Sequence, residues 1–235
     1  MTRSIEQLVE QAGRLAGGGR WDEAEQVWLE VRRREPQHPR ALFSLGVHAL
    51  KRGDGAGAGA LLTEARELQP NDVLVLMTLC AACQHVGDAV AEREAIEAGL
   101  AVDAYFLPAL LAKGRWLERF GTRAGASATY ASALKIAPHA RDWPAALRAD
   151  LEHALEVVAA HTSALDEHLT RAVGPLLAEL PAGTAARWRE AAALVAGKSK
   201  PYTSQSNQLH VPRLPAIPFF DRAQFPFLDA IEAKT

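Results

Sequence analysis

Hydrophobic and small residues recur in the first half of the chain at a spacing of 34 positions. Counted from residue 5, the fourth position of each period is leucine: Leu8, Leu42, Leu76 and Leu110. The eighth position carries small side chains: Ala12, Gly46, Cys80 and Gly114. Apolar residues within each period follow the spacing of a helix face rather than the alternation of a strand. Each period therefore predicts a pair of helices that approach closely at the small residue.

Glycines mark the predicted turn inside each period, at Gly19, Gly53, Gly87 and Gly121. Because glycine adopts a left-handed backbone at little cost, we expect a left-handed cap at each of them. The residues expected to start the second helices are Asp22, in a capping box with Glu25, then Asp54, Asp88 and Thr122. Large residues expected to fill the space between neighbouring repeats stand at the twenty-fourth position: Trp28, Leu62, Ile96 and Tyr130.

A helix–turn–helix unit of 34 residues is the period of the tetratricopeptide repeat (TPR), which this region resembles. The predicted fold is all-α, a right-handed TPR solenoid with C-terminal capping helices and an extended tail. Residues 5–138 hold four repeats, of which the third departs most from the pattern, at Glu92, Gly99 and Ala104. A fifth repeat is not expected, because it would place Pro144 inside its first helix and Arg148 at the small position.

Residues 139–197 are expected to form the capping helices that a solenoid needs at its end. Asp142 and Pro144 suggest the start of a first helix, Gly174-Pro175 a break in it, and Thr184 the start of a last helix. Residues 198–218 contain four prolines and read as an extended linker, and residues 219–235 as the beginning of another domain.

Net charge and hydropathy limit the partners. The net charge of −2 gives no general attraction to nucleic acid, and no apolar run is long enough to cross a membrane. The N-terminus lacks the apolar segment of a signal peptide. The chain also has only two cysteines, which fits a reducing compartment where disulfides are rare. We therefore expect the protein in the cytoplasm.

The end of the chain resembles a second family. The run LPAIPFFDRAQFPFLDAIEAKT, residues 214–235, resembles the segment that opens the hydroxylase domain of the aspartyl/asparaginyl β-hydroxylases. Bacterial members of that family carry TPR repeats ahead of a domain that uses Fe(II) and 2-oxoglutarate. The resemblance implies that both cofactors belong to a downstream domain and that this chain itself carries no cofactor. No residue of this chain matches the family's iron-binding or 2-oxoglutarate-binding positions.

Candidate catalytic and metal-binding residues favour structural interpretations. Cys80 and Cys83 could form a redox pair or half of a zinc site, but both fall on packing positions of the repeat. His153, His161 and His168 are about two helical turns apart, too far to share an ion. We therefore expect no catalytic residues and no metal site in these 235 residues.

The first helices of the repeats predict a concave binding groove. Its predicted lining residues are Arg40, Phe43, Val47, Lys51, Met77, Gln84, Leu111, Arg115 and Arg119. Apolar residues flanked by arginine and lysine suit a protein or peptide partner that carries acidic groups. The carboxylate clamp of chaperone-binding TPR domains is not matched, because Val9 and Gly13 stand at its first positions. The alternatives are a merely solvated groove or one filled by the chain's own tail or by a catalytic domain.

Two functions follow from the sequence. In the first, the repeats recruit or orient a substrate for a 2-oxoglutarate- and Fe(II)-dependent hydroxylase domain downstream. In the second, the chain is a stand-alone TPR adaptor that mediates protein–protein interaction with no catalytic role.

Overall fold

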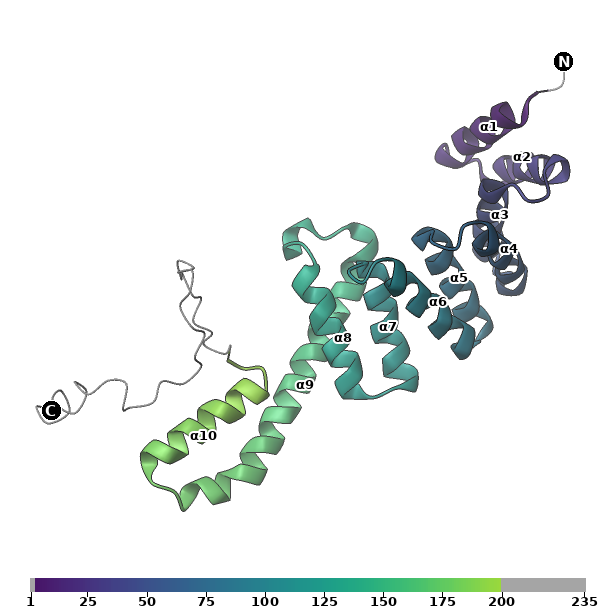
Figure 1. The fold of residues 1–235 in the computed structure, drawn as a ribbon. Coiled ribbons are helices and arrows are strands. Elements are labelled where there is room, and N and C mark those ends of the chain that lie inside the picture. Colours follow the sequence, from purple (N-terminus) through teal and green to yellow (C-terminus); the bar gives the residue numbers. More distant parts are fainter. Residues whose placement is uncertain (1–2, 200–235) are drawn as a thin grey trace, which may run out of the picture. The chain divides into compact units, whose positions relative to one another are not determined.

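The structure, a computed structural model, describes residues 3–199, and every regular element among them is helical (Figure 1). The helices of the first part are α1 (Ile5–Gly17), α2 (Trp21–Arg34), α3 (Pro39–Lys51), α4 (Gly55–Leu68), α5 (Val73–Val86) and α6 (Ala89–Val102). They are followed by α7 (Leu107–Phe120), α8 (Arg123–Ile136), a short 3₁₀ helix (Ala140–Asp142), α9 (Ala145–Ala178) and α10 (Ala182–Val195). The predictions for residues 200–235 lie outside the described residues.

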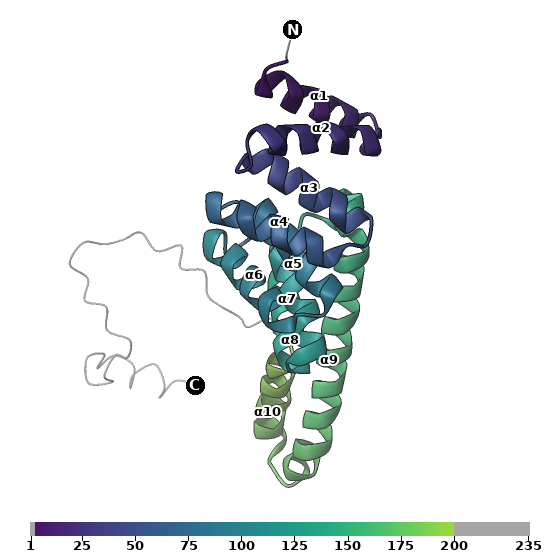
Figure 2. The same cartoon turned by 90° about the vertical axis from the view of Figure 1, so that its right-hand side faces the viewer.

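Consecutive helices pack in pairs: α1 with α2, α3 with α4, α5 with α6 and α7 with α8. The second helix of each pair packs on the first helix of the next. The long helix α9 packs against α8 and α7, and α10 folds back along the C-terminal part of α9 (Figure 2). The predicted all-α stack of helix pairs is confirmed.

The small residues of the eighth position set the distance between the two helices of a pair. A Cβ atom built on Gly46 would lie 2.7 Å from Cγ of Leu62, and one on Gly114 would overlap the ring of Tyr130. The large residues therefore fill the space within their own repeat. Leu62 also clusters with Cys80 of the following repeat, so it fills the space between repeats as expected.

Three of the four turn glycines adopt the expected left-handed conformation. Gly19, Gly53 and Gly87 have φ angles of 75°, 79° and 80°. The expectation for Gly121 is wrong, because its φ is −114°. A Cβ atom there would lie 2.6 Å from Cδ2 of Leu117, so close packing, not a left-handed turn, requires glycine at this position.

The predicted helix starts are confirmed for the later repeats and wrong for the first. Side-chain oxygens accept backbone N–H groups at the starts of α4, α6 and α8 from Asp54, Asp88 and Thr122. In the first repeat, α2 begins at Trp21 with Arg20 as its N-cap. Asp22 therefore lies inside the first turn, where it cannot form the predicted capping box with Glu25.

The C-terminal helices differ from the sequence expectation. Helix α9 is continuous over 34 residues and runs through Gly174 and Pro175, so the predicted break is wrong. Tertiary contact overrides the local preference: Leu177, beyond the proline, is buried where α10 packs against α9. The predicted N-caps are also wrong, because Asp142 lies in the 3₁₀ helix and Thr184 lies inside α10.

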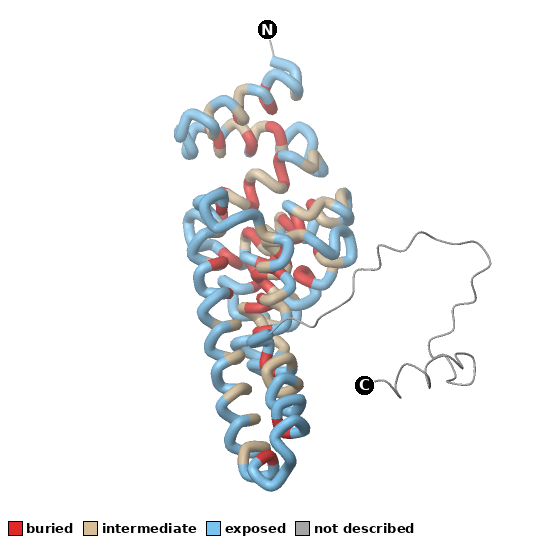
Figure 3. The backbone as a smooth tube through the Cα atoms, turned by 90° about the vertical axis from the view of Figure 1, so that its left-hand side faces the viewer, coloured by how far each residue is buried: buried red, intermediate tan, exposed pale blue. Residues whose placement is uncertain are grey.

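Burial is uneven along the described residues (Figure 3). Buried side chains form clusters that join each repeat to the next, and the last cluster joins α7 and α8 to Leu151 and Ala154 of α9. After Ala154, only Leu177 of α9 and Ala185 of α10 are buried within these two helices. The α9–α10 pair therefore has a thin core.

Candidate functional site

The second, fifth, ninth and thirteenth positions of the repeat lie on one face of each first helix, because they are three or four residues apart. The small residue at the eighth position turns the neighbouring face toward the second helix, as at Gly46 against Leu62. The second and ninth positions of α1, α3 and α5 stay at least partly exposed, whereas the fifth position packs against the core: Val9 is buried, and Phe43 and Met77 are partly buried.

The second repeat presents both apolar and charged groups on this face. Phe43 and Val47 are half-buried, and Phe43 packs against the core with part of its ring. Arg40 is exposed at the start of α3, and no carboxylate of residues 3–199 forms an ion pair with it. This repeat contributes an apolar surface with one cation at its edge.

The third repeat continues the apolar surface along α5. Leu74 has 59% of its surface exposed, Met77 is half-buried and Gln84 is exposed. A Cβ atom on Gly99 would lie 2.9 Å from Cε of Met77, so this glycine makes room for the methionine methyl group. The unusual glycine of the third repeat therefore supports the groove residue Met77.

The thirteenth position contacts the preceding repeat. Nζ of Lys51 lies 2.9 Å from the centre of the Trp21 ring, and Nε2 of His85 lies 2.8 Å from the carbonyl oxygen of Gly53. Arg119 pairs with Glu92 in the same way. Lys51 and Arg119, predicted to line the groove, thus hold neighbouring repeats together.

The fourth repeat is closed by α9. Leu111 is 1% exposed and belongs to the core cluster that α7 and α8 form with α9. Arg115 forms an ion pair with Asp150 of α9. Arg115 and Arg119, two of the three arginines predicted to line the groove, therefore both have a carboxylate partner within the chain.

A second polar contact fixes α9 at this end. The carboxylate of Glu118 accepts a hydrogen bond of 2.6 Å from the Tyr130 hydroxyl and contacts Nε2 of His153 at 2.8 Å. Burial raises the pKa of Glu118, but the hydrogen bonds from Tyr130 and His153 outweigh it and hold this pKa below its ordinary value. Helix α9 is thus anchored by both charge and packing.

A hollow of about 580 Å³ lies between α1 and the start of α3. Its lining includes Ile5, Val9, Gly13, His38 and Arg40. The predicted groove starts at the second repeat, whereas the hollow also includes residues of the first. The same positions, fifth and ninth, would have identified Val9 and Gly13.

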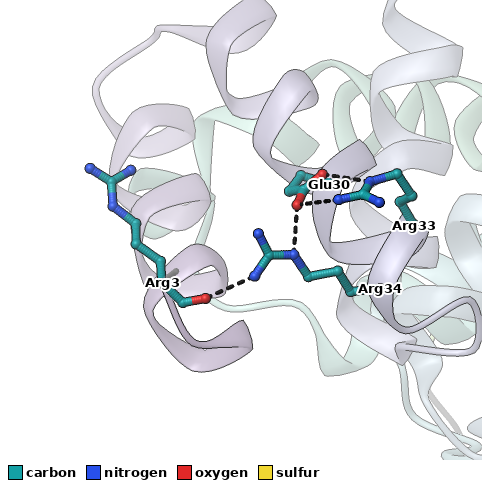
Figure 4. Close-up of polar contacts among 4 residues, drawn as sticks. All are labelled: Arg3, Glu30, Arg33 and Arg34. Carbon is teal, nitrogen blue, oxygen red and sulfur yellow. Dashed lines mark hydrogen bonds and ion pairs between the residues drawn. The ribbon is translucent and has the colours of Figure 1, made fainter. Parts of the chain in front are cut away.

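The arginines at the end of α2 already have partners (Figure 4). Arg33 donates two hydrogen bonds of 2.8 Å to Glu30, and Arg34 donates one of 2.6 Å to the same carboxylate. Arg34 also donates to the carbonyl oxygen of Arg3 at 2.8 Å. The hydrogen bonds from Arg33, then Arg34, lower the pKa of Glu30 to about 2. Arg33 and Arg34 therefore stabilise α2, and Arg34 links it to the residues just before α1.

The two cysteines are structural. Cys80 and Cys83 are free thiols buried in the core cluster of the second and third repeats. Burial raises the pKa of Cys80 to about 12 and also raises that of Cys83. Protonated, buried thiols are poor nucleophiles and poor metal ligands, so packing accounts for both.

Residues 3–199 contain no group of three or more histidine, cysteine or acidic side chains placed to hold a metal ion. Over the same range, no helix combines the length and the apolar character needed to span a bilayer. The partly exposed apolar residues of α3 and α5 and the hollow between α1 and α3 make the groove of α1, α3 and α5 the candidate functional site.

Comparison with known proteins identifies the fold. A family model described as tetratricopeptide repeat matches residues 9–73. Among curated proteins, none matches the chain.

Several solved structures share the architecture, among them one described as a TPR protein. MamA from Desulfovibrio magneticus is 20% identical with a TM-score of 0.54, and the match covers 57% of this chain and 75% of that one. A thermophilic TPR protein of Thermus thermophilus is 22% identical with a TM-score of 0.53, covering 82% and 100% of the two chains. The structure titled APC/C hetero-tetramer Cut9-Hcn1 is 16% identical with a TM-score of 0.56, covering 84% and 41%. At these identities the likeness shows the TPR fold alone.

Proposed function

We propose that this chain is a protein-interaction module that binds an apolar segment of a partner along α1, α3 and α5. The observation that carries the proposal is the row of apolar residues Phe43, Val47, Leu74 and Met77 along α3 and α5, of which Leu74 is exposed and the other three are partly exposed. TPR modules typically bind proteins, and the Cut9-Hcn1 structure is, by its title, a hetero-tetramer of two named proteins.

Arg40, which has no ion-pair partner within residues 3–199, refines the expected partner. Arg115 and Arg119 pair with Asp150 and Glu92, which leaves Arg40 to receive an acidic side chain. Arg40 lies at the start of α3, on the hollow that is also lined by Glu6 and by the Glu10–Arg14 ion pair, so an acidic group of the bound segment would sit on Arg40 itself. The partner is thus mainly apolar, with an acidic residue near one end.

A peptide selection tests this function. Random 16-residue peptides displayed on phage would be selected on the full chain, and the affinities of the selected peptides would be measured by fluorescence anisotropy. Val47→Glu should weaken binding by about tenfold or more, because it places a charge on the apolar surface. Leu29→Glu is the matched control, since Leu29 is 44% exposed on the second helix α2.

The selected peptides also test the role of Arg40 separately from that of the apolar surface. Arg40→Glu should weaken those peptides that carry an acidic residue and spare the others. The proposal fails if no peptide is enriched, or if Leu29→Glu weakens binding as much as Val47→Glu.

A second candidate function rests on the resemblance of residues 214–235 to the opening segment of aspartyl/asparaginyl β-hydroxylase domains. In that case the same groove would hold the protein substrate of a downstream domain that supplies Fe(II) and 2-oxoglutarate. The coding sequence after Thr235 tests this directly. Codons for a pair of histidines and a carboxylate able to ligate iron would support it, and a stop codon would exclude it.

A further inference from the structure

A partly open, mainly apolar slot of about 380 Å³ lies between α9 and α10, a volume within the range of small-molecule sites. Its floor is formed by Leu169, Val173 and Leu177 of α9 and by Ala192 and Ala193 of α10. The slot lies away from the groove of α1, α3 and α5, in the part of the described residues where few side chains are buried.

Gly174 lies in the wall of this slot and keeps it open. Apart from the adjacent residues and the backbone of its own helical turn, no atom lies within 4 Å of a Cβ atom built on Gly174. Glycine inside a helix costs about 1 kcal/mol relative to alanine, and Pro175 adds a further cost. Packing against a neighbour does not require this glycine, as it does at Gly46, and Gly174 is the glycine that lines the slot.

Of the charged side chains that line the slot, Asp166 is already paired, whereas Arg189 is able to bind a ligand. Asp166 forms an ion pair with Lys198, which neutralises that side of the slot. Arg189 lines the slot from α10, is exposed, and has no carboxylate partner among residues 3–199. An arginine at the mouth of an apolar slot can bind a carboxylate with two parallel hydrogen bonds.

We propose that the α9–α10 slot binds a small amphiphile, an aliphatic chain that ends in a carboxylate. The chain lies on Leu169, Val173 and Leu177, and its carboxylate pairs with Arg189. This site is independent of the groove proposed for protein partners, since the two share no residue.

Three probes test the assignment on the full chain: octanoate, 1-octanol and acetate. Titration followed by ¹H–¹⁵N spectra should show octanoate shifting resonances of α9 and α10, and acetate shifting none of them. Octanol, which keeps the chain but lacks the charge, should bind about tenfold more weakly than octanoate.

Two variants locate the binding. Arg189→Gln should reduce the affinity for octanoate to that for octanol and leave octanol unchanged. Gly174→Leu should abolish both, because the new side chain fills the slot. The melting temperature of this variant should not fall, since leucine is the better helix former. Gly183→Leu is its control, because Gly183 also has open space at its Cβ but does not line the slot.

The assignment is overturned if octanoate leaves the α9 and α10 resonances unmoved at millimolar concentration. It is equally overturned if Gly174→Leu binds octanoate like the parent, or if Arg189→Gln does not discriminate between octanoate and octanol.

Discussion

Glu92 of α6 is 3% exposed, and its carboxylate pairs with the guanidinium of Arg119, which comes from the following repeat. The other three repeats have alanine where Glu92 stands: Ala24, Ala58 and Ala126. The third and fourth repeats are therefore joined by an ion pair where the other repeats pack a methyl group. A buried carboxylate is tolerated here because its partner is present.

The pair predicts unequal effects of its two members. Arg119→Ala should lower the free energy of unfolding by about 1–3 kcal/mol, because it leaves the carboxylate of Glu92 buried and unpaired. Glu92→Ala restores the residue of the other repeats and should cost much less, and the double variant should resemble Glu92→Ala. Urea unfolding measures all three. An equal loss in both single variants would show that the pair itself, not the unpaired carboxylate, sets the cost.

The sequence predicts the parts of the fold that repeat. Gly46 and Leu62 are assigned to facing helices by position alone, and the structure brings them into contact. The period carries no information on α9, so the pairing of Asp150 with Arg115 could not be read from it. For the same reason, the sequence assigned Arg115 to an open groove.

Local preference also fails where tertiary packing outweighs it. Gly174 and Pro175 are both poor helix residues and predict a break, yet the contact of α9 with α10 keeps the helix continuous. The slot beside Gly174 arises from a pairing of helices that no periodic signal specifies. In the groove, in contrast, the period does carry the information: Val9 and Gly13 of the first repeat stand at the same positions as Phe43 and Val47 of the second, and both line the hollow.

The contact between Arg115 and Asp150 predicts that charge reversal loosens α9. Arg115→Glu should lower the melting temperature because it opposes two carboxylates. Adding Asp150→Arg should restore part of the loss by reversing the pair. Arg40→Glu, on the same face without a described partner, should leave the melting temperature close to that of the parent. No recovery in the Arg115→Glu, Asp150→Arg protein would argue against a direct interaction.

The contact between Gly46 and Leu62 predicts that alanine, normally the better helix former, is harmful at this glycine. Gly46→Ala should destabilise by about 1–3 kcal/mol because its Cβ would overlap Leu62. Gly59→Ala, in α4, meets open space and should stabilise by about 0.5–1 kcal/mol. Chemical unfolding of both variants measures the change in the free energy of unfolding, which should fall for Gly46→Ala and rise for Gly59→Ala. If Gly46→Ala stabilises the protein, the helices are not in close contact there.

Buried His48 predicts a pH dependence of stability in mild acid. His48 is 4% exposed, with its ring edge against Trp21 at 5.5 Å between ring centres. Burial lowers the pKa of His48 below its ordinary value of 6.5, and nearby Arg52 and Lys51 lower it further, against the opposing effect of Glu25.

The sign of the change in stability with pH depends on whether the folded or the unfolded state protonates His48 at the higher pH. As pH falls below about 6.5, the unfolded chain protonates His48 while the folded protein does not, so the unfolded state is favoured. Stability from this residue is complete above that pH and is lost progressively as pH approaches the lower, folded pKa. Between pH 7 and about 5, most carboxylates stay ionised and disturb the measurement little.

Melting temperatures of the parent and of His48→Leu between pH 7 and about 5 measure this contribution. The parent should lose more stability across the range than the variant, because leucine cannot take up a proton. His168→Leu removes an exposed histidine of α9 and should keep the pH dependence of the parent. Parallel curves for the parent and His48→Leu would mean that His48 titrates alike in both states. The acid sensitivity would then have to arise outside the contact between the first two repeats.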